Sequence, residues 1–358
     1  MKNINKSRRV EYYPWSIAVL NQCLEENHKG RIPALDLELT AKCTGAYCIY
    51  CDSRPGVCEK ENPLELDFSV LKQAILEAKE RGLKWVYTCG LGEPLEDPKF
   101  WDLIQLLKEQ DIVLSMFTNG VFVKNIDVAK RLKECNVNLI LKMDTFNAEN
   151  FDKILGRSGI ANKIYKARDL LLQAGYGSKD GKYTDLAFSI VPTSLSIDGI
   201  PEVISFCEEN GIFPSVGELE QAGEVINNKL TDVLGINKQQ ILSLKAAADK
   251  YYNGSYMRPI CPCILSGVHI DNIGNCVVDR DTGLNCKWFL LKDPQTTVIG
   301  NIRNSSLSEL FEKAQEYRKR AFDYRKEQIL ELGQISYVFG GCGGNPKDII
   351  HLAIEQYE

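Results

Sequence analysis

The sequence predicts an α/β fold followed by a smaller C-terminal domain, and three observations support this prediction. Of the 358 residues, 44% are hydrophobic and 25% are charged, which is typical of a globular protein and excludes disordered, collagenous and coiled-coil chains. From residue 33 to about residue 217, short β-rich runs alternate with amphipathic stretches of helical period. After residue 217 the alternation stops and cysteines become dense. The chain is long enough for two domains.

Repeated β–α units dominate the first part of the chain. The pairs Arg81-Gly82 and Asn210-Gly211 are helix stop signals, and Asp67 occupies an N-cap position. Parallel strands need a helical crossover, so the pattern predicts a parallel sheet. The pattern alone fits an open barrel or a doubly wound sheet, and six units are too few for a closed eight-stranded barrel. The expected strands are Ala34–Leu39, Lys84–Thr88, Ile112–Phe117, Val137–Met143, Leu186–Val191 and Ile212–Val216. The expected helices are Phe68–Arg81, Pro98–Gln110, Ile126–Glu134, Ile160–Ala174 and Ile200–Asn210.

The domain boundaries follow from this change of pattern. We expect an N-terminal extension over residues 1–32, a barrel over 33–217 and a linker region over 218–254 that contains a polar helix at 228–252. Residues 255–345 are expected to form the small domain, and residues 346–358 a last helix. Because the small domain has weak hydrophobic periodicity, we expect a bound metal centre to stabilise it.

Charge and cysteine content limit the possible functions. The 43 Lys and Arg residues against 48 Asp and Glu residues give a net charge of -5, which predicts no nucleic-acid partner. No apolar run is long enough to span a membrane and no secretion signal is evident, so we expect a cytoplasmic protein without a membrane partner. In a reducing compartment, 13 cysteines indicate metal ligation or thiol chemistry rather than disulfides.

Three of these cysteines, Cys43, Cys48 and Cys51, form a C-x4-C-x2-C motif directly after the first expected strand. Three thiolates on one loop suit a soft metal or an iron–sulfur cluster. A zinc ribbon needs a second C-x2-C pair, and a plant-type [2Fe–2S] ferredoxin needs a fourth cysteine in a small domain. Neither fits this chain. Three ligands for four irons leave one iron open, which by analogy with zinc marks a catalytic site.

The sequence resembles the radical S-adenosylmethionine (radical SAM) superfamily. The resemblance covers about residues 33–216 and implies a partial (β/α)6 TIM-like barrel with a [4Fe–4S] cluster whose fourth iron binds SAM. Reductive cleavage of SAM would then give a 5′-deoxyadenosyl radical that abstracts hydrogen from the substrate. The common family spacing is C-x3-C-x2-C, so this chain has one extra residue in the first interval. Besides the cysteine loop, the motifs that carry the resemblance are Gly90-Leu91-Gly92-Glu93-Pro94, Thr118-Asn119-Gly120 and Met143-Asp144.

The resemblance also implies which residues contact SAM. The aromatic residue before the third cysteine is expected at the adenine, and a glycine after the second strand lets the backbone approach a ligand closely. A basic residue is expected at the SAM carboxylate, for which arginine is the better bidentate partner; a solvated surface charge is the alternative. The acidic residue after the fourth strand is expected at the ribose hydroxyls or as the cap of the next helix. The candidates are Tyr50, Gly92, Glu93, Lys142, Asp144, Arg157 and Ser189.

A second group of cysteines lies in the C-terminal region. Together with Val298–Asn301, Leu307–Phe311 and a terminal GGCGG sequence, it resembles the SPASM/twitch extension of radical SAM enzymes. That resemblance implies an auxiliary [4Fe–4S] cluster, and five cysteines favour one cluster, with a small zinc site as the alternative. Asp279 stands where the family places a cysteine, so Cys276 or Asp279 is expected to replace a standard ligand. The candidate ligands are Cys261, Cys263, Cys276, Cys286 and Cys342.

Enzymes with this extension mostly modify peptides, so the resemblance favours hydrogen abstraction from a peptide that leads to crosslinking, epimerisation or oxidation. Residues 1–32 are too short for the N-terminal recognition domain of many peptide maturases. The alternatives are a dehydrogenase of a small alcohol such as an aminocyclitol, and a non-enzymatic iron–sulfur or zinc protein. Asp279 and Asp281 are candidate catalytic bases, and flavodoxin or ferredoxin is the expected reducing partner.

Histidines and the remaining helical cysteines are expected to be structural. His28, His269 and His351 show no metal-ligand spacing. Cys135 and Cys207 lie on expected helix faces, where cysteine usually packs as a small hydrophobic residue.

Overall fold

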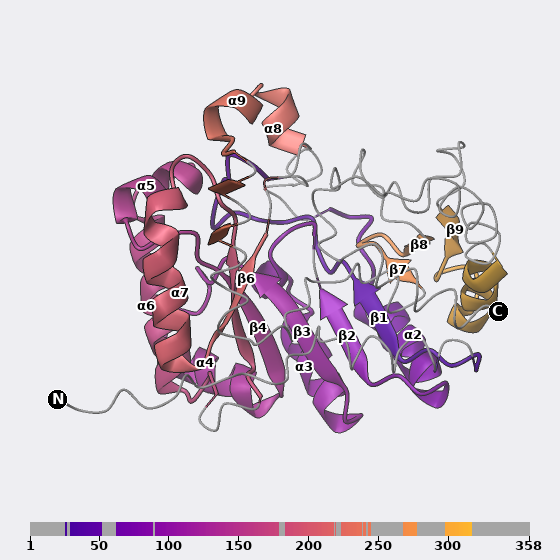
Figure 1. The fold of residues 1–358 in the computed structure, drawn as a ribbon. Helices are drawn as coiled ribbons and strands as arrows, with labels where there is room; N and C mark the ends of the chain where they lie inside the picture. Colours follow the sequence, from indigo (N-terminus) through magenta and orange to yellow (C-terminus); the bar gives the residue numbers. More distant parts are fainter. Residues whose placement is uncertain are drawn as a thin grey trace.

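A computed structural model describes residues 26, 29–51, 62–88, 90–178, 183–217, 219, 223–237, 239–240, 243–244, 268–277 and 298–316. These residues form one sheet with helices packed along one face (Figure 1). The strand order is β6-β5-β4-β3-β2-β1-β7-β8-β9. The strands are β1 (Ala34–Leu37), β2 (Trp85–Thr88), β3 (Val113–Thr118), β4 (Val137–Lys142), β5 (Leu186–Ile190), β6 (Phe213–Val216), β7 (His269–Ile270), β8 (Asn275–Val277) and β9 (Val298–Asn301).

Strands β1 to β6 are all parallel to their neighbours, which confirms the expected partial barrel of six β–α units. Each pair of successive strands is joined by at least one helix. The helices are α2 (Phe68–Glu80), α3 (Phe100–Glu109), α4 (Ile126–Glu134), α5 (Ala148–Ile154), α6 (Ile160–Gln173), α7 (Ile200–Asn210), α8 (Gly223–Asn227) and α9 (Thr231–Leu234), with 3₁₀ turns η2 (Pro94–Glu96) and η3 (Ile197–Gly199).

The two faces of the sheet differ in chemistry. Apolar strand residues such as Leu35, Val86 and Leu139 are buried in the core that the helices cover. On the other face, the strand register aligns Asp36 with Tyr87, Tyr87 with Ser115, and Ser115 with Asn138. This row is buried as well, so the inner face of the barrel carries polar groups. Alternation along each strand separates the two sets of side chains.

Helix boundaries follow local capping chemistry. The Asn125 side chain accepts a hydrogen bond from the Val128 amide and begins α4 at the expected residue. At the C-terminal end of α7, Gly211 adopts a φ of 65°, a left-handed conformation that glycine enters readily and that stops the helix. Helix α5 is absent from the sequence-based expectation, because seven residues are too few to show a clear helical period.

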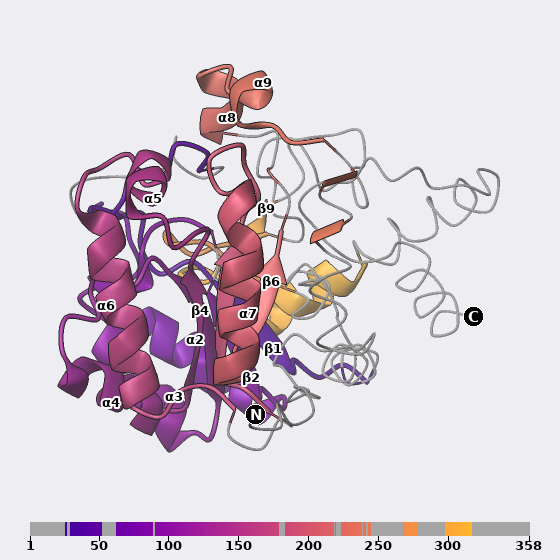
Figure 2. The same cartoon turned by 60° about the vertical axis from the view of Figure 1, so that its left-hand side comes forward.

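The region after β6 differs from the expected single polar helix over residues 228–252. Helix α9 ends at Leu234, and Gly235 is extended with φ -62° and ψ 146°. Both α8 and α9 lie beyond the carboxyl ends of the barrel strands, while α6 and α7 run along the outer face (Figures 1 and 2). The Glu224 amide of α8 donates to the Cys51 carbonyl at 3.1 Å, so α8 contacts the cysteine loop.

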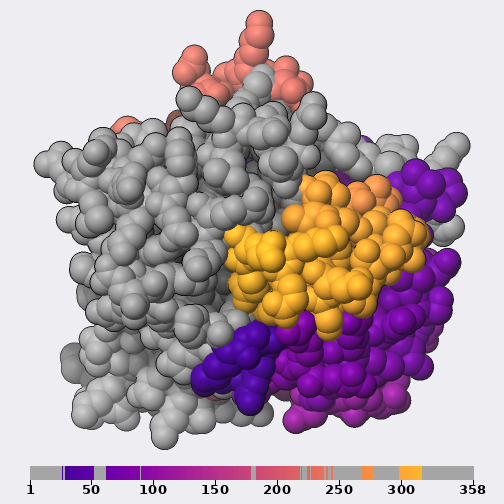
Figure 3. Space-filling view, turned by 90° about the vertical axis from the view of Figure 1, so that its right-hand side faces the viewer, coloured from indigo at the N-terminus to yellow at the C-terminus, as the bar shows by residue number. Residues whose placement is uncertain are grey.

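The described part of residues 255–345 continues the barrel sheet. Strand β7 pairs in parallel with β1, and β8 and β9 follow in antiparallel pairing. Residues 307–316 are helical and dock on α2, where Glu77 accepts hydrogen bonds from the Leu307 and Ser308 amides at 3.0 and 2.9 Å. Figure 3 shows this segment against the part of the chain that contains β1 and α2. The division into separate domains stays a prediction.

None of the helices within the described ranges is both long enough and apolar enough to cross a lipid bilayer.

Candidate active site

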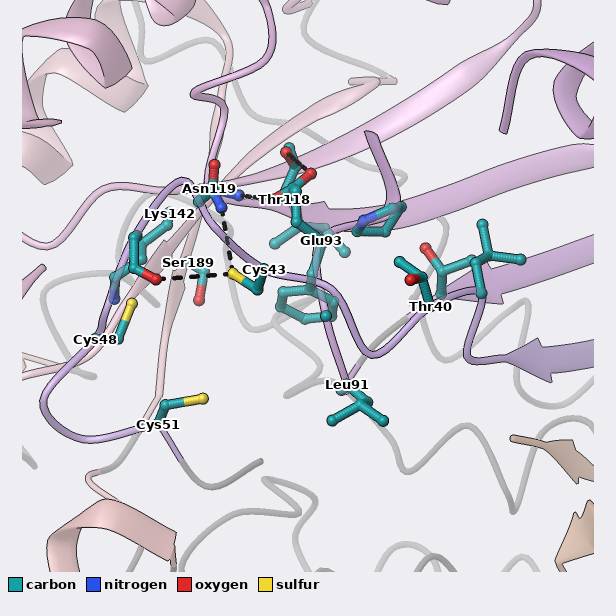
Figure 4. A pocket seen from close by; sticks show the side chains of 18 of the residues that line it. Thr40, Cys43, Cys48, Cys51, Leu91, Glu93, Thr118, Asn119, Lys142 and Ser189 are labelled. Carbon is teal, nitrogen blue, oxygen red and sulfur yellow. Dashed lines mark hydrogen bonds between the residues drawn. The ribbon is translucent and has the colours of Figure 1, made fainter. Parts of the chain in front are cut away.

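A cavity of about 200 Å³ lies at the carboxyl ends of the barrel strands, where β/α barrels usually place their active sites. Most of the motifs singled out in the sequence meet here (Figure 4). The residues that carry polar or sulfur-containing groups into its lining include Cys43, Cys48, Tyr50, Cys51, Glu93, Thr118, Asn119, Lys142 and Ser189.

All three cysteines of the C-x4-C-x2-C motif line this cavity (Figure 4). Burial, and to a smaller extent the nearby Glu93 carboxylate and Cys48, raise the pKa of Cys43 to about 12. Such a thiol becomes a thiolate only beside a positive centre such as a bound metal. Among the described residues, no three His, Cys, Asp or Glu side chains are grouped so as to hold a single metal ion. Three sulfur donors around one cavity fit an iron–sulfur cluster in their chemistry.

Glu93 joins the motif after β2 to the motif after β3. The residue is 2% exposed, and its carboxylate accepts hydrogen bonds from Thr118 Oγ1 and the Asn119 amide, both at 2.7 Å. Burial raises the pKa of Glu93 to about 7, although the hydrogen bonds from Thr118 and Asn119 lower it. Both carboxylate oxygens are therefore engaged within the protein, and the side chain aligns the loop that borders the cavity.

Gly92 is required by a close approach within the chain itself. Its φ is +78°, and a Cβ atom there would lie 2.0 Å from the Thr40 carbonyl oxygen. The next amide, that of Glu93, donates to the Lys42 carbonyl at 2.8 Å. The loop after β2 thus packs directly on the residues that lead into Cys43.

Tyr50, Lys142 and Asp144 form one largely buried network beside the cysteines. The Tyr50 hydroxyl donates to Asp144 Oδ2 at 2.6 Å, and Lys142 Nζ donates to the same oxygen at 2.9 Å and to the Tyr50 hydroxyl. The Lys142 side chain is 14% exposed, so its interpretation as a solvated surface charge is wrong. Burial lowers the pKa of Lys142, but Asp144 and the neighbouring Cys48 raise it above its usual value overall. Lys142 is therefore a cation at the cavity wall.

Asp144 does not cap the next helix, so that alternative is wrong. The cap of α5 is Asn147, whose side chain accepts from the Asn150 amide at 3.0 Å. Asp144 is fully buried and its second oxygen accepts from the Val191 amide at 3.0 Å. Its carboxylate connects the ends of β4 and β5. Contact of Asp144 with ribose hydroxyls stays a prediction.

The structure brings Ser189 to the cavity but places Arg157 elsewhere. Arg157 is exposed, donates from Nη1 to the Thr44 carbonyl at 2.6 Å and lies over the Tyr47 ring at 3.6 Å. It therefore contacts the cysteine loop outside the described cavity. Its expected contact with the SAM carboxylate stays a prediction.

Most candidates of the second cysteine group lie outside the described residues. Cys276 is described: it lies on β8, is buried in the hydrophobic core, and burial raises its pKa to about 12. Its role as a cluster ligand stays a prediction. The candidates outside the described residues are Cys261, Cys263, Cys286, Cys342, Asp279 and Asp281.

Two acidic residues that hold the cysteine loop were missed in the sequence. Glu65 accepts from Thr40 Oγ1 at 2.9 Å and from the Ala41 amide at 2.7 Å. Glu96 accepts from the Thr44 and Gly45 amides. An acidic residue in a loop normally looks like a solvated charge, and the only sequence signal was the position of Glu96 one turn after Glu93.

Comparison with known proteins adds to this geometry. Residues 37–185 match the model of the Radical SAM superfamily. The chain is 28% identical over 317 residues to the mycofactocin maturase MftC of Mycolicibacterium smegmatis, and the aligned region covers 86% of this chain and 77% of that protein. It is 25% identical over 253 residues to the probable GTP 3′,8-cyclase of Methanocaldococcus jannaschii, and the aligned region covers 69% of this chain and 78% of that protein.

Solved structures show the same fold. SuiB of Streptococcus suis bound to S-adenosylmethionine superposes with a TM-score of 0.53 and 16% identity, covering 80% of this chain and 67% of SuiB. The structure of anSMEcpe with bound AdoMet has a TM-score of 0.52 and 16% identity, covering 91% of this chain and 98% of that chain.

A cysteine-lined cavity at the carboxyl ends of six parallel strands defines a β/α-barrel enzyme suited to an iron–sulfur cluster. The family match over residues 37–185 and these relatives identify the protein as a radical SAM enzyme. This identification implies a [4Fe–4S] cluster and S-adenosylmethionine as cofactors, for which the three thiols and the adjoining cavity fit.

Proposed function

We propose that this enzyme cleaves SAM reductively at a cluster held by Cys43, Cys48 and Cys51 and abstracts a hydrogen atom from a peptide substrate. The observation that carries the proposal is that the three thiols share one cavity with the Gly92 loop and the Lys142 ammonium group. The expected outcome is crosslinking, epimerisation or oxidation of a peptide side chain during maturation.

Each residue of the site has a role consistent with this chemistry. When bound, the cluster would supply the electron that breaks a carbon–sulfur bond of SAM. Lys142 would bind the SAM carboxylate, since Asp144 holds the ammonium group at the cavity wall. Phe117, Ile140 and Val191 give the cavity an apolar side that excludes water from a reactive radical.

A peptide substrate is supported by the relatives. MftC is a maturase by name and its match spans 86% of this chain, against 69% for the GTP cyclase. One SuiB structure, with a TM-score of 0.52, is bound to the precursor peptide SuiA. A small-molecule substrate such as an aminocyclitol is the alternative that the experiments must exclude. The non-enzymatic alternative is set aside, because these relatives are enzymes.

Other parts of the proposal concern residues outside the described ranges. An auxiliary [4Fe–4S] cluster held by the second cysteine group would give an electron from an oxidised substrate an exit. Asp279 or Asp281 would then deprotonate that substrate. A flavodoxin or ferredoxin would supply the reducing electron to the SAM site.

The first experiment measures SAM cleavage. Anaerobically reconstituted protein, reduced with dithionite and given SAM, should form 5′-deoxyadenosine and methionine. A variant with Cys43, Cys48 and Cys51 all replaced by alanine should form neither. Cys135→Ala is the matched control, since Cys135 is buried outside the cavity lining and its loss should leave cleavage unchanged. Parent protein that is loaded with iron and reduced but forms no 5′-deoxyadenosine would overturn the proposal.

The second experiment identifies the substrate class. Short peptides encoded beside this gene, deuterated in their side chains, are incubated with the enzyme and SAM. Deuterium in 5′-deoxyadenosine together with a mass change of the peptide supports the peptide class. Deuterium transfer from an aminocyclitol and from none of the peptides would overturn it.

A further inference from the structure

Glu96 holds the part of the cysteine loop that contains the extra residue. The loop has four residues between Cys43 and Cys48. Glu96 Oε1 accepts from the Thr44 amide at 2.6 Å and from the Gly45 amide at 3.2 Å, while Oε2 accepts from Thr44 Oγ1 at 2.7 Å. One carboxylate thus fixes two successive peptide units directly after Cys43.

The other side of the same loop is held by the segment after α5. Arg157 donates to the Thr44 carbonyl at 2.6 Å and lies over the Tyr47 ring. The Tyr47 amide donates to the Leu155 carbonyl at 2.8 Å. The remaining residue of the interval, Ala46, is buried, and its carbonyl accepts from Cys43 Sγ at 3.8 Å. Every residue of the interval is therefore anchored.

Space around the loop is also restricted. A Cβ atom on Gly45 would lie 3.1 Å from the side chains of Val121 and Phe122 and 3.3 Å from Asn119 Nδ2. The same Asn119 nitrogen is 3.8 Å from Cys43 Sγ. The loop is consequently wedged between the motif after β3 and the Glu96 carboxylate, and a change in its path would move the Cys43 sulfur.

We propose that Glu96 is a positioning residue that preorganises the widened cysteine loop, so that Cys43 and Cys48 reach the same cluster. The identity of the cluster rests on the proposed function. The hydrogen bonds that Glu96 accepts from the loop, here called the Glu96 clamp, are made within the protein and do not depend on the cluster. Preorganised ligands bind a metal centre with less loss of conformational freedom. Without the clamp, the loop must be ordered by the cluster itself.

The first test needs no cluster. Amide hydrogen exchange over residues 43–51 is measured by mass spectrometry in the metal-free protein. Glu96→Ala should raise the exchange rate of this segment about tenfold or more, because the Thr44 and Gly45 amides lose their acceptor. Glu96→Gln keeps an acceptor oxygen in nearly the same place and should restore slow exchange. Glu149→Ala, at an exposed carboxylate paired with Lys153, is the matched control and should leave the segment unchanged.

The second test connects the clamp to the cluster. The difference in iron content between the parent and the variant that lacks Cys43, Cys48 and Cys51 gives the iron bound at the SAM site. After anaerobic reconstitution, Glu96→Ala should retain less than about half of that iron. Its reduced cluster should also show a changed electron paramagnetic resonance spectrum, and Glu96→Gln should recover both. Equal exchange rates in Glu96→Ala and the parent, or equal iron and spectra in spite of faster exchange, would overturn the inference. Failure of the proposed function would give a different result, because the parent itself would then lack the cluster or SAM cleavage. The hydrogen-exchange comparison would still show whether Glu96 orders the loop.

Discussion

At Gly92, the chain passes so close to the loop that carries the cysteines that only hydrogen fits in place of a side chain. The position has both a positive φ and no room for a Cβ atom, which would lie 2.0 Å from the Thr40 carbonyl oxygen. Gly159 is a useful comparison, because its φ is almost the same at +77° but a Cβ atom added there would meet no other atom within 4 Å. An alanine at either position meets the strain of the positive φ, but only an alanine at Gly92 also meets a steric overlap, so comparing the two variants separates these effects.

We therefore expect Gly159→Ala to lower the free energy of unfolding by about 1–2 kcal/mol, the usual penalty for a left-handed residue. Gly92→Ala should lower it by at least about 2 kcal/mol more and should reduce iron uptake at the Cys43 site, because the overlap displaces the backbone before Cys43. Urea unfolding and iron analysis check this. Similar losses in both variants would mean that the close approach to Thr40 has no effect.

The buried carboxylate of Asp144 offers a second prediction. It accepts hydrogen bonds from Tyr50, Lys142 and the Val191 amide, so Asp144→Asn leaves the largely buried Lys142 cation without its anion. We expect a loss of about 3–5 kcal/mol in the free energy of unfolding. The control Asp169→Asn breaks an exposed pair with Arg168 and should change stability by less than about 1 kcal/mol. Chemical denaturation of both variants gives the comparison, and a small effect of Asp144→Asn would contradict the network.

A site residue was predictable from the sequence where its backbone position fixes where its side chain lies, and was not predictable where a long side chain can contact several partners. Residues next to a strand end, such as Cys43, Lys142 and Ser189, were predictable because parallel strands bring their carboxyl ends to one edge. Arg157 and Glu96 were not, because a long side chain outside the strands and α-helices can reach several partners equally well. Their contacts with Thr44 depend on how two loops pack, and periodicity carries no information about that.

At the scale of secondary structure, the six strands and five of the helices between them were predictable from alternation and stop signals. The pairing of β7 with β1 was not. Strand β7 has only two residues, and its buried polar residue His269 looked structural but had no visible partner. In the structure, His269 Nδ1 lies 2.7 Å from Asp36 Oδ2, and Nε2 lies 3.7 Å from Glu38 Oε1, so the charges that face it come from β1 and the residue that follows it.

This pairing predicts a pH dependence of stability. Burial lowers the pKa of His269, but the Asp36 carboxylate raises it to about 9 overall, against an unfolded value near 6.5. A raised pKa means that the stabilisation is fully present below about pH 6.5 and is lost as the pH rises through about 9. At about 1.4 kcal/mol per pKa unit, the loss is on the order of 3 kcal/mol.

The measurement compares urea unfolding of the parent and His269→Gln at about pH 6 and about pH 9.5. The parent should lose stability between these values, and the variant should lose clearly less, because glutamine does not titrate. An identical pH dependence in both proteins would show that His269 is not a protonated partner of Asp36 and Glu38. Asp36→Asn gives a second check, since it removes the anion that raises the pKa.

At the scale of the whole molecule, the change of pattern after residue 217 predicted a separate small domain. In the described residues, β7, β8 and β9 continue the sheet of the barrel and residues 307–316 pack on α2, while the division into domains stays a prediction. A strand that adds to the edge of a sheet needs only a few backbone hydrogen bonds, so its partner leaves no trace in local periodicity. The consequence is that Cys276, the described member of the second cysteine group, lies on a strand of the same sheet as β1, which leads into the first group.

This continuity gives a specific expectation for the auxiliary centre. If the second cysteine group holds one [4Fe–4S] cluster, the reconstituted protein contains about 8 iron atoms per chain, and the triple variant of Cys43, Cys48 and Cys51 about 4. Cys342→Ala should also reduce the iron to about 4 and expose residues 255–290 to limited proteolysis, since a metal centre contributes folding energy. The barrel, which supplies most of the buried core residues, should survive in part in that variant.

Iron analysis and mass spectrometry of the proteolytic fragments check these expectations together. Cys135→Ala is again the control, because it removes a thiol from the core without touching either cysteine group. About 4 iron atoms in the parent protein would contradict the auxiliary cluster while leaving the SAM site intact. Iron near 8 with an unchanged digestion pattern in Cys342→Ala would mean that pairing of β7 with β1, rather than the cluster, holds the C-terminal region to the barrel.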